Sequence, residues 1–269
     1  MKLLTWRSVL EDHAHSLLAV RHGATEWNVQ DRVATTTDVE LTEEGVAQAT
    51  AAGKALSGVK IDRVICSPMK RARDTATQLL ASASFEGEIE IDERLREPPA
   101  GPFEGEVFSE LWGGTHRLSP VFARSVAEED PEIPDGAEHP AETASKLCGL
   151  LEELEAAPGR YLLVSHGGLI RALAAEFAGT DPPYARRLKL DNCHAVALKW
   201  YDKPPHQVLA VNLPPGSEQD RPRQSLKEAC IAAGAVEATD EEYAARKGER
   251  SLSFFGPLRA RKRRKPPRQ

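Results

Sequence analysis

Four segments that lie far apart in the sequence carry side chains suited to the chemistry of a phosphate ester. Each segment comes at, or shortly after, the end of a short apolar run of strand type. The residues concerned are Arg21 with His22, Ser67 with Arg71, Glu97, and His166 with Gly167 and Gly168. Ligands of an open parallel sheet bind at the carboxyl ends of its strands, where helix N-termini also point. We therefore expect these residues to converge on one site.

Two guanidiniums and two imidazoles in one place favour the binding of a phosphate dianion. Arginine offers a planar set of N–H donors to the phosphate oxygens, and a neutral histidine can act as a nucleophile near pH 7. An alkoxide is a poor leaving group, so an acid must protonate it, and Glu97 is the best placed carboxyl. The pattern predicts phosphoryl transfer to a histidine and then to water.

The elements that would position these residues alternate between strand and helix. Apolar runs predict strands at residues 16–20, 62–66, 88–91, 160–164, 194–200 and 207–211. Helical spacing predicts helices at residues 43–56, 141–155 and 169–177, and Ser67 and Pro68 are typical of an N-cap and a first helical position. This order predicts an α/β fold, a three-layer sandwich whose mostly parallel sheet is flanked by helices.

The pattern breaks between residues 98 and 140, which are rich in Gly and Pro with isolated aromatic residues. A segment of this length inside a compact domain is typical of a lid. We therefore predict an N-terminal extension at 1–15, a catalytic domain at 16–213 with a lid insertion at 98–140, and a polar C-terminal extension at 214–269 that ends in a mobile basic tail.

Composition limits the class of protein. Hydrophobic residues make up 41% of the 269-residue chain and charged residues 28%, which indicates a soluble globular protein. The apolar runs are too short to span a membrane, and no export signal precedes them, so a cytoplasmic location is expected. The four cysteines are too scattered for a structural zinc site or a disulfide framework. No metal or organic cofactor is expected.

The charge is unevenly distributed. The chain has a net charge of −6, yet residues 259–269 hold seven Lys or Arg and no acid. The rest of the chain is therefore strongly acidic, which argues against a dedicated nucleic-acid binder, although the basic tail could contact an anionic partner weakly. The expected partner is a small phosphorylated metabolite, and the sequence does not indicate an oligomeric state.

The motifs around these residues resemble those of the histidine phosphatase superfamily, also called phosphoglycerate mutase-like proteins. Five segments match in the family's order: residues 21–28 (RHGATEWN), 41–49 (LTxxGxxQA), 67–76 (SPxxRAxxTA), 95–105 (LxE with a following EG) and 164–168 (VSHGG). An Arg-His-Gly tripeptide alone would be weak evidence, but five ordered segments are specific. The resemblance covers residues 16–211.

This resemblance implies a role for each matching residue. It implies that His22 is phosphorylated and that Glu97 is the proton donor. It further implies a phosphate pocket with supporting contacts, made by Arg21, Arg71, His166, Thr25, Asn28 and Gly167. Members of the family generally need no metal for hydrolysis. Glu104 is the next candidate if Glu97 is not the acid.

The sequence also departs from the family pattern. Ala100 stands where an aromatic residue is usual, two prolines follow Glu97, residues 35–37 (TTT) replace a Gln-Gly pair, and His139 stands in place of a serine. These changes lie around the expected substrate pocket, so they affect substrate identity more than phosphoryl chemistry. Trp112, His116, Arg117 and His139 either line that pocket or belong to a merely polar lid.

Four functions remain open from the sequence. The first is a phosphatase for a small phosphate monoester. The others are a mutase that returns the phosphoryl group to its substrate, a catalytically idle scaffold, and a pocket recruited for chemistry without phosphate. The stretch from Glu97 to His166 is shorter than in mutases, which favours the phosphatase. Outside the site, Cys66 and Cys193 are expected in the core, and His194 on the buried face of a strand.

Overall fold

The computed structural model describes residues 4–126, 132–178, 188–201 and 207–216. Its centre is a six-stranded sheet in the order β3-β2-β4-β1-β5-β6. The strands are β1 (Ser16–Arg21), β2 (Arg63–Cys66), β3 (Ile89–Ile91), β4 (Arg160–Ser165), β5 (Ala195–Lys199) and β6 (Gln207–Leu213). The first four strands are parallel to one another, whereas β5 and β6 form an antiparallel edge. The predicted α/β class and mostly parallel sheet are confirmed.

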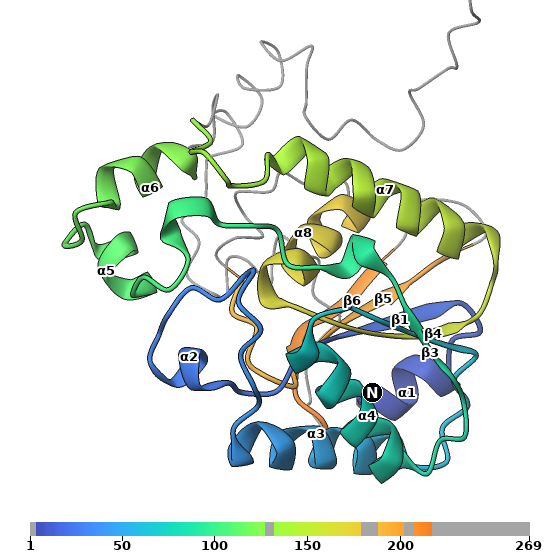
Figure 1. The fold of residues 1–269 in the computed structure, drawn as a ribbon. Coiled ribbons are helices and arrows are strands. Elements are labelled where there is room, and N and C mark those ends of the chain that lie inside the picture. Colours follow the sequence, from blue (N-terminus) through green and yellow to red (C-terminus); the bar gives the residue numbers. More distant parts are fainter. Residues whose placement is uncertain (1–3, 127–131, 179–187, 202–206, 217–269) are drawn as a thin grey trace, which may run out of the picture.

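Helices cover both faces of the sheet, as Figure 1 shows. The helices are α1 (Trp6–Glu11), α2 (Glu26–Val29), α3 (Glu43–Ala55), α4 (Lys70–Ala83), α5 (Phe108–Gly113), α6 (Ser119–Ser125), α7 (Pro140–Ala156) and α8 (Gly167–Ala178). Two short 3₁₀ turns are η1 (Glu93–Leu95) and η2 (Gly101–Phe103). Helices α1, α3 and α4 lie on one face, and α7 and α8 lie on the other.

The alternation of side chains along β1 explains the two cores. Leu17 and Ala19 point to the layer of α7 and α8, whereas Leu18 and Val20 point to the layer of α1, α3 and α4. All four side chains are buried, which is why this strand reads as a continuous apolar run in the sequence. The sheet is therefore fixed from both sides, and the residues that follow its strands start from a rigid base.

The N-terminal residues belong to the packed structure. Thr5 caps α1, and Trp6 is fully buried and donates its indole N–H to the carbonyl of Leu213 at 2.9 Å. The segment that we treated as an N-terminal extension thus packs against the sheet. The C-terminal extension beyond residue 216, with its basic tail, lies outside the described residues.

Two local predictions were wrong. Helix α4 begins at Lys70 with Met69 as its N-cap, not at Pro68. The hydroxyl of Ser67 accepts from the backbone N–H of Met69 at 3.3 Å and contacts His166, so it lies before the helix and does not cap it. His194 lies outside β5 and is only partly buried, with its ring near the carbonyl of Asn192. Cys66 and Cys193 are buried, as expected.

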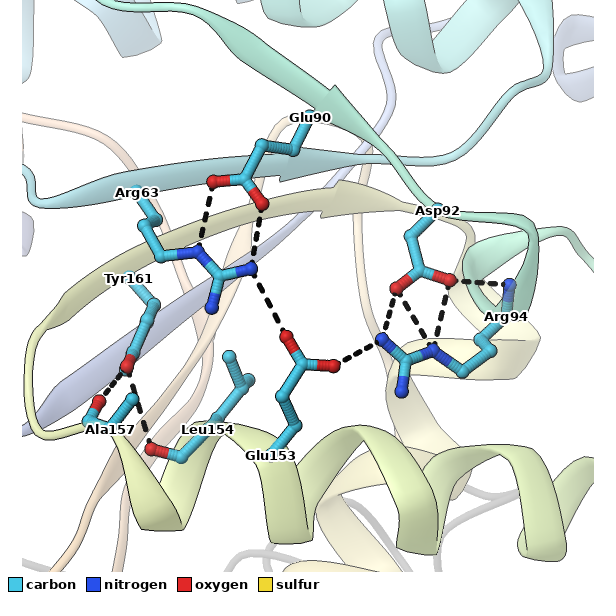
Figure 2. A network of polar contacts seen from close by, with 8 residues as sticks. All are labelled: Arg63, Glu90, Asp92, Arg94, Glu153, Leu154, Ala157 and Tyr161. Atoms are coloured by element: carbon cyan, nitrogen blue, oxygen red, sulfur yellow. Dashed lines mark hydrogen bonds and ion pairs between the residues drawn. The ribbon is translucent and has the colours of Figure 1, made fainter.

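An ion-pair network holds the segment that leads to Glu97. Figure 2 shows Glu153 of α7 between Arg63 of β2 and Arg94 of the turn η1. Arg63 also forms two hydrogen bonds with Glu90 of β3, at 2.9 and 2.6 Å, and Arg94 binds Asp92. These groups are partly exposed, so each pair adds little stability, but the network ties β3 and its turn to α7.

Candidate active site

The register of the parallel strands brings the two histidines together. Arg21, the last residue of β1, pairs with Ser165 of β4, and His22 and His166 follow at neighbouring positions. The amide of His22 donates to the carbonyl of Ser165 at 2.9 Å. The imidazole rings are consequently 5.3 Å apart between centroids. The predicted convergence of these two segments is confirmed.

The glycines of two sequence motifs let two backbones meet behind His22. A Cβ atom on Gly23 would lie 2.5 Å from the carbonyl oxygen of Gly45, and a Cβ on Gly45 would collide with the backbone of Ala24. The amide of Gly23 also donates to the hydroxyl of Thr75 at 2.9 Å. Larger residues would push the His22 segment away from α3 and α4, so these positions require glycine.

His22 is buried and oriented by its own neighbour. Its Nδ1 lies 2.8 Å from the carbonyl oxygen of Gly23, so Nδ1 carries the proton and Nε2 keeps a free lone pair. Burial, assisted by the nearby charges of Arg21 and Arg71, holds the pKa of His22 well below its usual value. The imidazole is therefore neutral at pH 7, which is the form that can attack phosphorus.

His166 is fixed between two residues of the α4 segment. Nε2 of His166 lies 2.7 Å from the hydroxyl of Ser67, and Nδ1 accepts a hydrogen bond from Nε of Arg71 at 3.2 Å. Burial, followed by the charges of His22 and Arg71, lowers the pKa of His166 well below its usual value. His166 is thus neutral at pH 7.

Arg71 is fully buried and mostly engaged by the protein itself. Besides the bond from Nε to His166, its Nη1 donates to the carbonyl of Thr37 at 2.9 Å. Its Nη2 donates to the carbonyls of Ala34 and Thr35, both at 3.2 Å. Because a guanidinium has five N–H groups, a single N–H on Nη1 is left for a ligand. Arg71 can therefore offer a phosphate its charge and one hydrogen bond, fewer than the planar set of donors expected from sequence.

Glu104 organises the loop that holds Arg71. Its carboxylate accepts hydrogen bonds from the backbone N–H groups of Thr35, Thr36 and Thr37, at 2.9 to 3.2 Å, and from the hydroxyl of Thr35. Although partial burial alone would raise the pKa of Glu104, these hydrogen bonds lower it. Glu104 is therefore an ionised acceptor with no proton to donate. This geometry argues against our reserve assignment of Glu104 as the acid.

The Nε–H of Arg21 has no hydrogen-bond acceptor among the described residues. Its Nη1 donates to the carbonyl of Leu190 at 2.6 Å, but its buried Nε has no hydrogen-bond partner among the described residues. Burial, together with the nearby Arg171, lowers the pKa of Arg21 to about 10, so the side chain stays charged at neutral pH. A buried unpartnered N–H is costly unless a ligand accepts its hydrogen bond. An anion at this position would satisfy it.

Glu97 lies against the first turn of α8, the helix that directly follows His166 in the chain. Its two carboxyl oxygens accept hydrogen bonds from the backbone N–H groups of Gly168 and Leu169, at 3.1 and 3.3 Å. A Cβ on Gly168 would collide with this carboxyl, so the second glycine of the HGG motif makes room for it. Burial raises the pKa of Glu97, although Arg171 and Arg71 oppose that effect. A raised pKa suits a group that must carry a proton.

Thr25 and Asn28 form a reciprocal cap at the start of α2. The hydroxyl of Thr25 accepts a hydrogen bond from the backbone N–H of Asn28, and Oδ1 of Asn28 accepts one from the backbone N–H of Thr25. The side-chain amide of Asn192 joins them by donating to Asn28 and to the carbonyl of His22, both at 3.0 Å. Contact of Thr25 and Asn28 with a phosphate stays a prediction, as does contact by Gly167, the first residue of α8.

A cavity of about 310 Å³ opens beside Glu97, between described residues of the 98–140 segment and α8. Most of its wall is apolar and includes Phe103, Phe122, Ile133, Pro134, Ala144 and Ala172. Arg171 of α8 also lines it, a residue that we did not predict although it lies one helical turn after Gly167. Among the described residues, no group of three or more His, Cys, Asp or Glu side chains is arranged to hold a metal ion.

None of the four polar or aromatic residues that the sequence left undecided lines this cavity in the described part of the chain, although His139 lies between the lining residues Glu138 and Pro140. Arg117 is 77% exposed and, like His116, pairs with Glu106. Trp112 is 54% exposed and stacks on Phe108. His139 caps α7 through its ring nitrogen. Sequence alone could not separate these residues from the cavity wall, because both kinds alternate along the same insertion.

Comparison with known proteins decides the family. Residues 17–213, well over half of the chain, match the model of the histidine phosphatase superfamily (branch 1). The chain belongs to this superfamily. The matched region begins at the second residue of β1 and ends at the last residue of β6, so apart from Ser16 it contains every strand of the described sheet.

Relatives within the superfamily carry the names of phosphatases and of mutases. The chain is 33% identical over 190 residues to a probable phosphoglycerate mutase of Proteus mirabilis, which covers 69% of this chain and 85% of the relative. It is 31% identical over 172 residues to the glucosyl-3-phosphoglycerate phosphatase of Mycobacterium tuberculosis, covering 60% and 74%. Among solved structures, it resembles phosphoserine phosphatase from Entamoeba histolytica in complex with 3-phosphoglyceric acid, with a TM-score of 0.63, 25% identity and coverage of 73% and 96%.

None of the helices in the described part of the chain has both the length and the apolar character needed to cross a bilayer.

Proposed function

We propose that this histidine phosphatase hydrolyses a phosphate monoester through a phosphohistidine on His22. The observation that carries the proposal is the orientation of His22. Its Nδ1–H is held by the carbonyl of Gly23, so that Nε2 is unprotonated in a pocket that also holds Arg21, Arg71 and His166. The unpartnered Nε of Arg21 supports the binding of an anion there.

The reaction proceeds in two steps on this geometry. Nε2 of His22 attacks phosphorus, the bond between phosphorus and the ester oxygen breaks, and protonated Glu97 gives its proton to that oxygen. The imidazolium of the phosphohistidine keeps its Nδ1–H on the Gly23 carbonyl. A water molecule then attacks phosphorus, loses a proton to the Glu97 carboxylate, and releases inorganic phosphate from His22. Arg21 and Arg71 balance the charge on the phosphoryl oxygens, and His166 accepts a hydrogen bond from Nε of Arg71 and so holds that guanidinium in place.

The direct test is turnover of p-nitrophenyl phosphate and of an alkyl phosphate by the wild-type chain and by His22→Ala. We expect His22→Ala to lose turnover while its circular dichroism and thermal unfolding stay close to those of the wild type. Turnover should survive excess chelator. Activity of His22→Ala near that of the wild type would contradict the proposal, as would a loss in chelator that added metal restores.

A mutase is the second candidate, because one relative is named a probable phosphoglycerate mutase. The two activities differ in the fate of the phosphoryl group. A phosphatase releases it as inorganic phosphate, whereas a mutase transfers it to an alcohol of the substrate. Measuring inorganic phosphate and isomerised phosphoglycerate from the same incubation with 3-phosphoglycerate separates them. We expect no isomerised product from this chain.

A further inference from the structure

The cavity beside Glu97 is where the leaving half of a substrate must lie. Glu97 is the proposed proton donor to the ester oxygen, and it forms part of the cavity wall together with Gly168. An alcohol that departs with the proton of Glu97 therefore departs into this space. The chemistry of the wall should then match the chemistry of that alcohol.

The polar side chains of the wall are nearly all engaged by the protein. Thr35 binds Glu104, Ser125 donates to the carbonyl of Phe122, and Glu138 accepts from Thr143 and pairs with Lys146. These residues have bonding partners of their own. They therefore give no reason to expect that the alcohol is a polar molecule such as a sugar.

Arg171 is the exception. Among the described residues its guanidinium forms no hydrogen bond and no ion pair, although it is only partly exposed and lines the cavity. Its Nη1 and the Nε of Arg21 each lie 3.4 Å from the position that a Cβ on Gly167 would occupy. Burial lowers the pKa of Arg171, and only the charge of Glu97 opposes this effect. When Glu97 is protonated as the acid, that opposing charge is gone and an anion of the substrate must balance Arg171. Arg171 lines the cavity whereas Arg21 does not, so the anion on Arg171 belongs to the leaving half and not to the phosphate.

The size and lining of the cavity describe the rest of the alcohol. Its volume of about 310 Å³ lies at the lower end of the roughly 300–1,000 Å³ that is usual for ligand pockets, so it takes a small leaving group. Phe103 and Phe122, in edge-to-face contact at 5.2 Å, form an aromatic wall that favours an apolar group.

We propose that the alcohol is a small apolar hydroxy acid, whose carboxylate binds Arg171 and whose chain packs against Phe103 and Phe122. Arg171 and Glu97 both lie against the adjacent residues Gly167 and Gly168, so the carboxylate is close to the ester oxygen. A 2-hydroxy acid has this arrangement. The inference rests on the proposed function, because it places the ester oxygen at Glu97.

Four phosphate esters separate the two contacts: those of 2-hydroxyoctanoate, 2-octanol, lactate and 2-propanol. In the wild type, the carboxylate should raise kcat/KM by about 10- to 100-fold, as a hydrogen-bonded charge pair does. The longer chain should raise it by on the order of 10², at about fourfold per buried methylene with part of the chain left exposed. The ester of 2-hydroxyoctanoate should therefore be the best of the four.

Variants test each contact through ratios measured within one protein, which cancel any loss of folded enzyme. Arg171→Met should abolish the preference for a carboxylate and keep the preference for the long chain, and Arg171→Lys should retain part of the former. Phe122→Ser should do the reverse, and Phe122→Leu should restore the chain preference. The matched control is Arg124→Met, because Arg124 pairs with Glu132 outside the described cavity wall. This control should keep both preferences.

Three results would overturn the inference. They are equal kcat/KM for the four esters, an Arg171→Met variant that loses activity equally on acidic and neutral esters, and a preference for the short esters. In each case p-nitrophenyl phosphate is still hydrolysed in a His22-dependent manner. If p-nitrophenyl phosphate and all four esters resist hydrolysis, the proposed function fails first. The two failures are therefore distinguishable.

Discussion

Replacing Glu97 with Gln removes a proton from the site and little else. Glu97 accepts one hydrogen bond on each oxygen, from Gly168 at 3.1 Å and from Leu169 at 3.3 Å. A glutamine keeps one acceptor oxygen in place, so one of these long bonds is lost, at about 1 kcal/mol. That is roughly a fivefold effect, and it applies to every substrate. The loss of the proton adds a factor of about 10²–10⁴ only where the leaving group needs protonation.

Two substrates separate these contributions. An alkyl phosphate should lose at least about 500-fold in the phosphorylation step, whereas p-nitrophenyl phosphate should lose about fivefold, because p-nitrophenolate leaves without a proton. Quenched-flow measurement of the burst isolates this step from the later attack of water, for which Glu97 serves as base. The wild-type rate with the alkyl phosphate should also fall as pH rises through the raised pKa of Glu97, and Glu97→Gln should lack this limb. Equal losses on both substrates in the burst would refute the role of Glu97 as acid.

Three further predictions follow from the groups around His22. Glu104→Gln should slow the hydrolysis of both substrates equally, by about 10-fold or more, because it loosens the loop that holds Arg71. A loss of rate confined to the alkyl phosphate would instead indicate that Glu104 is the acid. Arg71→Ala should reduce kcat/KM by on the order of 10²–10³. Its control is Arg73→Ala, because Arg73 is exposed on the same helix, and this variant should change kcat/KM less than threefold. Similar effects of the two substitutions would show that Arg71 does not belong to the site. His22→Gln should gain stability relative to the wild type as pH falls below about 6.5, by up to about 1.4 kcal/mol per pH unit. The reason is that His22 is protonated in the unfolded chain but stays neutral in the folded one. Urea-unfolding profiles of the two proteins that run parallel from pH 7.5 to 5.5 would contradict this.

The order of strands and helices could be predicted from sequence because β1, β2 and β4 are buried on both sides and therefore form unbroken apolar runs. The direction of β5 and β6 could not, since an apolar run has the same pattern in a parallel and an antiparallel strand. The start of α4 was misplaced for a different reason. Ser67 and Pro68 have the composition of a helix start, but a contact 99 residues away, with His166, uses the hydroxyl of Ser67.

The parts of the candidate site that could be predicted from sequence belong to motifs at or shortly after strand ends. They are His22, His166, Arg71 and Glu97. The missing parts depend on contacts between distant segments. Glu104 could be named from sequence as a candidate acid, but not as the residue that holds the loop at Thr35. That contact joins residues 69 positions apart, and no local sequence pattern indicates it. Arg171 carried a detectable signal, because it lies four residues after Gly167 on a predicted helix.

The central claim is that the phosphoryl group passes through His22, and trapping the intermediate tests it most directly. The wild-type chain is mixed with a ³²P-labelled alkyl phosphate, quenched in alkali during the burst, and digested for mass spectrometry. We predict label that is stable in base, labile in acid, and located on the peptide containing His22, at up to one phosphoryl group per chain. His22→Ala should carry none. A wild-type chain that turns over rapidly without labelled His22, or that carries the label on another residue, would contradict the account.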